Sequence, residues 1–173
     1  APDQQDAADE AMKQVSIQLP IIFLVEFALA QLWMSWGVKP DLMIGHSLGE
    51  NTAACIAGVL KFEDALDLLI LRGKLTQSAR EGAMTSVNLS AAELEPLLEG
   101  ECDLALVNAP ELCVAAGSPS AIEALEKRLA DREIEFRRLP ISRAGHSRLF
   151  DPILDEFQAF LSKLKLDRPK IPF

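Results

Sequence analysis

Apolar residues with helical spacing dominate two parts of the chain, from residue 17 to 81 and from 151 to 164, whereas residues 1–14 are polar and acidic. Residues 17–36 form the longest such stretch, and polar residues within it, such as Glu26, predict a buried amphipathic helix rather than a membrane span. Gly37 and Pro40 follow directly and indicate that this helix stops there, since glycine is favoured just past a helix and proline soon after. The other helical patterns cover residues 50–60, 62–81 and 151–164.

The middle of the chain shows the alternation of apolar and polar positions that is typical of strands. Met84–Leu89 is the first of these strands, and Ser90 with Glu93 has the spacing of a helix capping box directly after it. Three more strands are predicted at 103–108, 112–116 and 134–141, with a helix at 119–132 before the last. The resulting order of strand, helix, strand, strand, helix and strand is that of a ferredoxin-like fold.

The two kinds of pattern predict an α/β core that carries an inserted α+β subdomain. A chain of 173 residues is long enough for one domain with a small insertion. We expect residues 85–141 to form the ferredoxin-like subdomain. Residues 1–84 and 142–173 are expected to form an α/β hydrolase-like core.

One stretch between the first two helical patterns carries the chemistry. Asp41–Ile44 is a short run that predicts a strand, and it leads into Gly-His-Ser-Leu-Gly at residues 45–49 and then a helical run. This is the strand, sharp turn and helix of a nucleophile elbow. Ser47 is then expected at the tip in a strained backbone conformation, with the Leu48 N–H pointing to where an oxyanion would form. We expect the two glycines to let strand and helix approach closely, because a Cβ would clash there.

A serine hydroxyl is a poor nucleophile near neutral pH, so a general base must reach it. The chain has two histidines. His46 is adjacent to Ser47, and neighbouring side chains of an extended segment point to opposite faces. We therefore expect the downstream loop histidine, His146, to be the base, which matches the chain order of Ser-His enzymes built on this kind of sheet. The group that orients it is left open between a backbone carbonyl and the carboxylates of Asp103, Asp131 and Asp151.

Arg72 is the other singular residue. It follows the apolar run Leu68–Leu71, which should face the core, and it precedes Gly73. An arginine at such a position either extends its head to solvent or faces a cleft that needs a fixed positive charge. In the second case it would pair with a substrate carboxylate.

Composition narrows the function classes. The net charge of −9 argues against nucleic-acid binding, and 49% hydrophobic with 25% charged residues is typical of a soluble globular protein. The three cysteines have spacings that fit neither a disulfide framework nor a zinc site. We expect them to be small core residues in a reducing compartment, so that the protein is cytoplasmic. We also expect no metal, from the cysteine spacing, and no membrane contact, from the polar residues within the apolar run 17–36.

Several motifs then recur in an order that is typical of one family. They are Trp36–Pro40, Gly45–Glu50, Ala54–Leu60, Arg72–Gln77, Val107–Pro110, Val114–Gly117, Gly145–Ser147 and Asp151–Leu154. Together they resemble the acyltransferase domains of modular type I polyketide synthases and the malonyl-CoA:acyl-carrier-protein transacylases of fatty-acid synthesis. The resemblance covers roughly residues 17–157.

This resemblance implies a ping-pong transfer of a malonyl-type unit. Ser47 would take the acyl group from coenzyme A, with His146 as base and then acid, and the Leu48 N–H as part of the oxyanion hole. Arg72 would pair with the free carboxylate of the acyl unit. The phosphopantetheine thiol of an acyl carrier protein would then collect the group. The family implies no tightly bound cofactor, flanking synthase domains as partners, and substrate contacts at Asn108 and Gly145.

The chain departs from the family pattern in three places. The family begins with a strand and a Gly-Gln-Gly turn whose glutamine helps complete the oxyanion hole, and nothing in Ala1–Gln14 matches it. The family also continues past Phe173, with a segment that orients the histidine through a backbone carbonyl, so we expect a core incomplete at both ends. The third departure is the extender-selecting tetrad, which is Arg143–His146 (Arg-Ala-Gly-His). Malonyl-selective members show His-Ala-Phe-His and methylmalonyl-selective ones Tyr-Ala-Ser-His, so the tetrad leaves the extender unit open.

Two alternative functions remain at this point. A serine esterase or thioesterase would use the same elbow but would have no need of a buried guanidinium at Arg72. An inactive scaffold fragment of a synthase would keep its docking surfaces and would not acylate Ser47.

Overall fold

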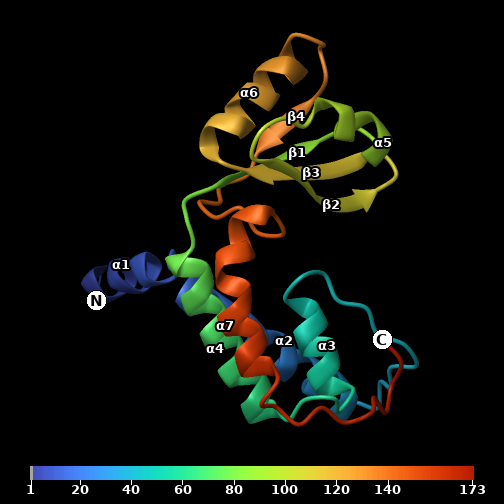
Figure 1. The fold of residues 1–173 in the computed structure, drawn as a ribbon. Coiled ribbons are helices and arrows are strands. Elements are labelled where there is room, and N and C mark those ends of the chain that lie inside the picture. Colours follow the sequence, from blue (N-terminus) through green and yellow to red (C-terminus); the bar gives the residue numbers. More distant parts are fainter. Residues whose placement is uncertain (1) are drawn as a thin grey trace. The chain divides into compact units, whose positions relative to one another are not determined.

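The computed structural model describes residues 2–173, and the chain forms two compact units (Figure 1). The first unit consists of Ala1–Gln77 and Glu156–Phe173, and the second of Ser78–Asp155. Each unit has a hydrophobic core of its own.

The first unit is built from helices. They are α1 (Pro2–Ala11), α2 (Val15–Ser35), α3 (Gly49–Ile56), α4 (Phe62–Ser78) and the later part of α7 (Asp151–Leu161). The core centres on Phe23 of α2, which is fully buried and whose ring stacks on Phe62 at a centroid distance of 5.7 Å. At Gly73 of α4 an added Cβ would lie 2.9 Å from the Ser16 Cα, so α4 packs closely against the start of α2.

The predicted strand at Asp41–Ile44 is not formed. These residues carry no ladder pairing, and the described part of the first unit holds no strand with which they could pair. Leu42 and Ile44 are 71% and 93% exposed as a result. The Met43 N–H instead donates to the carbonyl of Pro172 at 3.0 Å, which ties the segment to the end of the chain.

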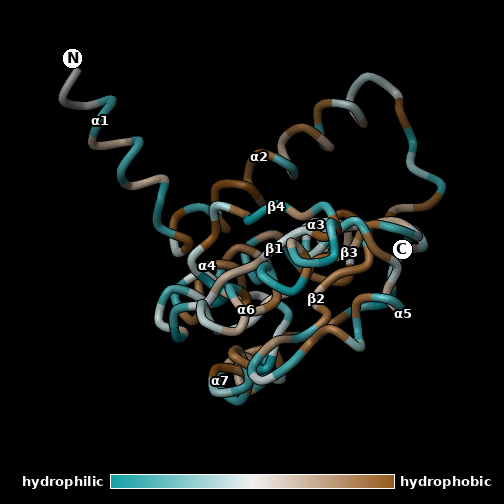
Figure 2. Tube along the Cα trace, turned by 90° about the horizontal axis from the view of Figure 1, so that it is seen from above, coloured by the Kyte–Doolittle hydropathy of each residue, from teal (hydrophilic) through white to brown (hydrophobic). Residues whose placement is uncertain are grey.

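The long helix α2 was predicted correctly as a helix but wrongly as a buried one. It begins at Val15, two residues before the predicted start, and Phe23 is the one buried residue among its 21. Its neighbours in the unit, α3 and α4, cover the side of Phe23. Many of its residues are apolar, brown along the tube in Figure 2, and several of these are exposed. By length and composition alone the helix could span a membrane, but core helices of soluble proteins meet the same two criteria.

The second unit confirms the predicted order of strands and helices. It contains β1 (Ala83–Val87), α5 (Ala91–Leu94), the 3-10 turn η1 (Glu95–Leu97), β2 (Cys102–Ala109), β3 (Leu112–Gly117), α6 (Pro119–Ala130), β4 (Phe136–Arg138) and η2 (Arg148–Phe150). The strands form an antiparallel sheet in the order β2-β3-β1-β4. The predicted capping box is present, with the Glu93 carboxylate accepting hydrogen bonds from the N–H (3.0 Å) and hydroxyl (2.6 Å) of Ser90.

The two faces of this sheet are covered by different segments. Val87, Cys113 and Ala115 face a core that contains Ile122, Leu125 and Leu129 of α6. The alternate positions of β1 and β3 pack instead against the segment that follows β4. That second cluster consists of Met84, Val114, Ala116, Ala144 and Leu149. The second unit therefore extends beyond the predicted insert of residues 85–141, because residues 142–150 cover one face of its sheet.

Candidate active site

The turn at residues 45–49 has the backbone of a nucleophile elbow. Ser47 has φ +53°, in the left-handed region that non-glycine residues seldom occupy, so the predicted strain at the tip is confirmed. The Gly49 N–H donates to the His46 carbonyl at 3.0 Å and the Glu50 N–H to the Ser47 carbonyl at 3.3 Å. The turn therefore closes directly into α3, and the N–H of Leu48 takes no part in these two bonds.

The two glycines of the elbow have different roles. A Cβ added to Gly45 would lie 2.1 Å from the Glu50 nitrogen, and the Gly45 N–H donates to the Glu50 carboxylate at 2.7 Å. A Cβ added to Gly49 would meet none of the described atoms within 4 Å. The expected close approach is therefore correct at Gly45 and wrong at Gly49, which simply begins the helix.

Arg72 of α4 points to the elbow. Its Nη2 donates to the Ser47 Oγ at 3.2 Å, and its Nη1 donates to the Oδ1 of Asn51 at 2.8 Å. The side chain is half-buried, and this burial lowers the pKa of the guanidinium by removing it from water. Of the two alternatives left by the sequence, the structure favours the one in which Arg72 faces the nucleophile.

Asn51 is a residue of this site that the sequence analysis missed. It lies four residues after Ser47, and residues i and i+4 share one face of a helix. This spacing was the signal that could have found it, because α3 begins immediately behind the nucleophile.

His46 lies beside a cavity rather than in the Ser47–Arg72 cluster. The cavity has a volume of about 490 Å³, and its lining includes His46, Glu26 and Thr52 but not Ser47 or Arg72. The Thr52 hydroxyl donates to the Glu26 carboxylate. His46 and Ser47 therefore have different surroundings, as expected, although the cause is the left-handed turn at Ser47 rather than an extended segment.

His146 lies in the second unit, in the segment between β4 and η2. It is exposed, and its φ of +60° makes it one of three described non-glycine residues with a left-handed backbone, with Ser47 and Glu133. Ala144, two residues before it, is fully buried under the sheet. The Ser147 hydroxyl donates to the Ala144 carbonyl at 2.7 Å, so His146 sits at the tip of a closed turn.

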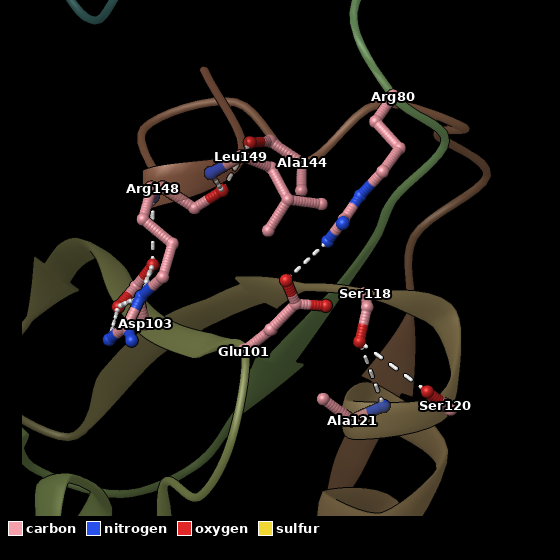
Figure 3. Close-up of polar contacts among 10 residues, drawn as sticks. Arg80, Glu101, Asp103, Ser118, Ser120, Ala121, Ala144, Arg148 and Leu149 are labelled. Carbon is pink, nitrogen blue, oxygen red and sulfur yellow. Dashed lines mark hydrogen bonds and ion pairs between the residues drawn. The ribbon is translucent and has the colours of Figure 1, made fainter. Parts of the chain in front are cut away.

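An ion pair fixes the same segment on the other side of His146 (Figure 3). The Asp103 carboxylate of β2 accepts hydrogen bonds from the Arg148 N–H at 2.9 Å and from the Arg148 guanidinium, with Nε at 2.9 Å. The hydrogen bond from the Arg148 side chain is the main cause that lowers the pKa of Asp103. Of the candidate orienting carboxylates, Asp103 is thus engaged by Arg148, Asp131 ends α6 and Asp151 begins α7.

The remaining predicted site residues also lie in the second unit. Asn108 is exposed near the end of β2. Gly145 directly precedes His146, and a Cβ added there would meet none of the described atoms within 4 Å. The structure thus brings Ser47, Leu48 and Arg72 together in the first unit, and places His146, Gly145 and Asn108 in the second.

Neither a metal site nor a reactive thiol is found in the part of the chain that the structure describes. No three His, Cys, Asp or Glu side chains gather there as metal ligands. The three cysteines are buried, as expected, and burial raises the pKa of Cys55 and of Cys102 to about 11.

Comparison with known proteins identifies the family. The family model described as "Acyl transferase domain" matches residues 4–173. The chain is 42% identical over 153 residues to the mycoketide-CoA synthase of Mycobacterium tuberculosis. The aligned region covers 88% of this chain and 4% of that protein.

Solved structures give the same result. The acyltransferase domain from the second module of the salinomycin polyketide synthase is 40% identical, with a TM-score of 0.91 over 94% of this chain and 39% of that one. The malonyl CoA-acyl carrier protein transacylase of Coxiella burnetii is 30% identical, with a TM-score of 0.88 over 94% of this chain and 55% of that one. The chain therefore spans only part of the length of the proteins that it matches.

Proposed function

The chain belongs to the acyl transferase domain family, and on that premise we propose that it transfers a malonyl-type unit in polyketide biosynthesis. The unit would pass from coenzyme A, through an ester on Ser47, to the phosphopantetheine thiol of an acyl carrier protein. The observation that carries this proposal is the Arg72 guanidinium, which lies 3.2 Å from the Ser47 hydroxyl.

The first half-reaction acylates the serine. The Ser47 Oγ attacks the thioester carbonyl while the imidazole of His146 takes the hydroxyl proton. The carbonyl oxygen becomes an oxyanion, for which the Leu48 N–H at the start of α3 is a suitable donor. The C–S bond then breaks, and the coenzyme A thiolate receives the proton from the imidazolium of His146.

The second half-reaction runs the same steps with a different thiol. The phosphopantetheine thiol of the carrier protein gives its proton to His146, and its sulfur attacks the Ser47 ester. The ester C–O bond breaks, and the Ser47 oxygen recovers a proton from the imidazolium. The left-handed backbone at both Ser47 and His146 supports these roles, because strained residues cluster at functional sites.

Arg72 is proposed to select the acyl group. A guanidinium pairs with a carboxylate through two parallel hydrogen bonds, so it favours a malonyl-type unit over an acetyl unit that lacks the carboxylate. A serine esterase or thioesterase is the alternative, but it has no use for a partly desolvated cation beside its nucleophile. The space at Gly145, next to His146, is proposed to admit a substituent on the malonyl unit, and Asn108 is proposed as a further substrate contact.

The setting of the reaction follows from the family. We propose a carrier protein and the flanking domains of a multidomain synthase as partners, a cytoplasmic location, and no tightly bound cofactor beyond the coenzyme A thioester that is consumed. The proposed partners are supported by the relatives, which include an acyltransferase domain from a polyketide synthase module and a malonyl CoA-acyl carrier protein transacylase.

Intact-protein mass spectrometry after incubation with malonyl-CoA tests the proposal. We expect a stable malonyl adduct that maps to Ser47 and is absent from Ser47→Ala, which removes a single hydroxyl and should largely keep the fold. Rapid release of free malonate would identify an esterase. A wild-type chain without any adduct would identify a scaffold and contradict the proposal.

A further inference from the structure

Two side chains bind the Arg72 guanidinium among the described residues. One is the Ser47 nucleophile, and the other is Asn51. Its Oδ1 accepts a hydrogen bond from the Arg72 Nη1 at 2.8 Å. Its own backbone N–H donates to the Leu48 carbonyl at 2.8 Å, within the first turn of α3. The residue is therefore fixed by the helix that begins at the elbow, and it reaches across to α4.

The contact with Asn51 determines how the guanidinium can be used. Arginine carries five N–H donors in a rigid planar fork. The contacts of Arg72 within the described residues take one hydrogen of Nη1, for Asn51, and one of Nη2, for Ser47. Donors therefore remain for a carboxylate, and the plane of the fork is set by the amide of Asn51.

The chemistry of an amide suits this role better than that of a carboxylate. The carbonyl oxygen of asparagine accepts from the guanidinium without neutralising its charge. An aspartate at the same position would form a charge-assisted pair with Arg72 and compete with any anionic group of the substrate. A side chain without an acceptor would leave the half-buried Nη1 unpaired and free to turn away from the nucleophile.

We propose that Asn51 is a positioning residue for Arg72 and thereby sets the preference for acyl units that carry a carboxylate. This inference rests on the proposed acyl transfer and adds to it a residue that acts through the guanidinium rather than by touching the substrate. It predicts that changes at Asn51 alter the malonyl-to-acetyl preference and leave the acylation machinery of Ser47 intact.

Two substitutions of nearly the same size as asparagine separate positioning from packing. Asn51→Asp keeps the shape and adds a negative charge, and Asn51→Leu keeps the approximate volume and removes the acceptor. The matched control is Asn88→Leu, because the exposed Asn88 also uses its amide in a side-chain bond, donating to Glu135 at 2.8 Å in the second unit. Rates of adduct formation on Ser47 are measured by quenched mass spectrometry with malonyl-CoA and acetyl-CoA in parallel.

The expected result is a loss confined to malonyl-CoA. A hydrogen bond to a charged group corresponds to a factor of roughly ten in rate, so the malonyl-to-acetyl ratio should fall about tenfold in Asn51→Leu and further in Asn51→Asp. Acetyl rates should stay within about twofold of wild type, as should both rates in Asn88→Leu.

The outcomes that overturn the inference differ from those that overturn the function. Equal losses for both thioesters would assign Asn51 a packing role, and an unchanged ratio would assign it none. Either result contradicts the inference while the wild-type adduct still stands. If the wild-type chain forms no adduct with either thioester, the acyl-transfer proposal fails and the inference falls with it.

Discussion

A single half-buried charge dominates the surroundings of the nucleophile at the residue scale. The Arg72 guanidinium has two neutral oxygen partners, Ser47 and Asn51, and burial lowers its pKa. A cation that is partly removed from water and not paired with an acid is costly to bury, so an anion that reaches it is bound strongly. We therefore place the choice of acyl group at this residue.

Replacing Arg72 tests that choice. Arg72→Ala removes a charge-assisted fork that corresponds to about 1.5–3 kcal/mol, so acylation by malonyl-CoA should fall by one to two orders of magnitude while acetyl-CoA is spared or gains. Arg72→Lys is the matched control, because it keeps the charge and loses the planar fork. Its malonyl-to-acetyl preference should lie between those of the wild type and Arg72→Ala. The preference ratio from parallel acylation rates is the quantity to measure. Equal losses with both thioesters would show that Arg72 only supports the fold.

Residues whose role depends on local geometry were predictable from the sequence, and those that depend on a neighbouring helix were not. The strained Ser47 follows from the Gly-x-Ser-x-Gly spacing alone, and the structure confirms it. The direction of the Arg72 side chain was left open, because its partners Asn51 and Ser47 lie 21 and 25 residues earlier in the sequence. The spacing of Asn51 from Ser47 could have placed it near the nucleophile, but its contact with Arg72 on α4 does not follow from that spacing.

The elbow and the histidine segment are the two elements that we propose carry the catalytic residues, and both are held by tight local packing. The elbow closes because Gly45 leaves room for the backbone of Gly49 and Glu50. The segment that carries His146 is anchored by the buried Ala144 before it and by the Asp103–Arg148 pair after it. In each element, the surrounding contacts hold one residue in a left-handed conformation, which is unfavourable without such support.

The two elbow glycines provide a matched pair of substitutions. Gly45→Ala places a Cβ 2.1 Å from a backbone nitrogen, so the turn must shift, and we expect a stability loss of about 1–3 kcal/mol with a more than tenfold loss of Ser47 acylation. Gly49→Ala meets no described atom within 4 Å and begins a helix, so it should be neutral or slightly stabilising. Urea unfolding and adduct formation measure both effects. Similar losses in the two variants would contradict the elbow geometry.

The second unit should lose stability in acid in a defined pH range. Hydrogen bonds from arginines are the main cause that lowers the pKa of three of its carboxylates. The pairs are Glu101 with Arg80 (Figure 3), Asp103 with Arg148, and Glu126 with Arg138. Because the folded pKa values lie below the unfolded ones, the stabilisation is complete above about pH 4–5 and is lost as the pH falls through the lowered values.

The urea midpoint followed by circular dichroism checks this range. It should stay level from pH 8 to pH 5 and fall below about pH 4. In the isosteric variant Asp103→Asn the fall should be shallower, since one of the three carboxylates is gone. A decline that begins near pH 6 would point to a histidine and contradict the assignment.

The whole molecule consists of two units with separate cores, and their predictability differs. The second unit follows from the sequence because each of its strands finds its partner within residues 83–138, so local alternation is enough. In the first unit the predicted strand at Asp41–Ile44 has no partner strand among the described residues, and α2 buries Phe23 alone. Periodicity predicts which face of a segment is apolar, but not what covers it.

The buried cysteines report on the two units separately. Cys55 lies in the first core, whereas Cys102 and Cys113 lie in the second. With thiol pKa values raised by burial, to about 11 for Cys55 and Cys102, none should react with a thiol reagent at pH 8 in the folded protein. The first unit leaves much of the apolar surface of α2 exposed, so Cys55 should become reactive at a lower urea concentration than the other two. Peptide mapping after labelling measures this, and simultaneous labelling of all three would show one cooperative unit instead.

The central claim is that the chain passes a carboxylated acyl group to a thiol and does not give it to water. The most direct measurement mixes the malonylated protein with a phosphopantetheinylated acyl carrier protein and follows the masses of both by spectrometry. We predict that the malonyl mass leaves Ser47 and appears on the carrier protein, and that a carrier protein without phosphopantetheine leaves the adduct in place. Loss of the adduct at the same rate with either carrier protein, and with no gain of mass on either, would contradict the account.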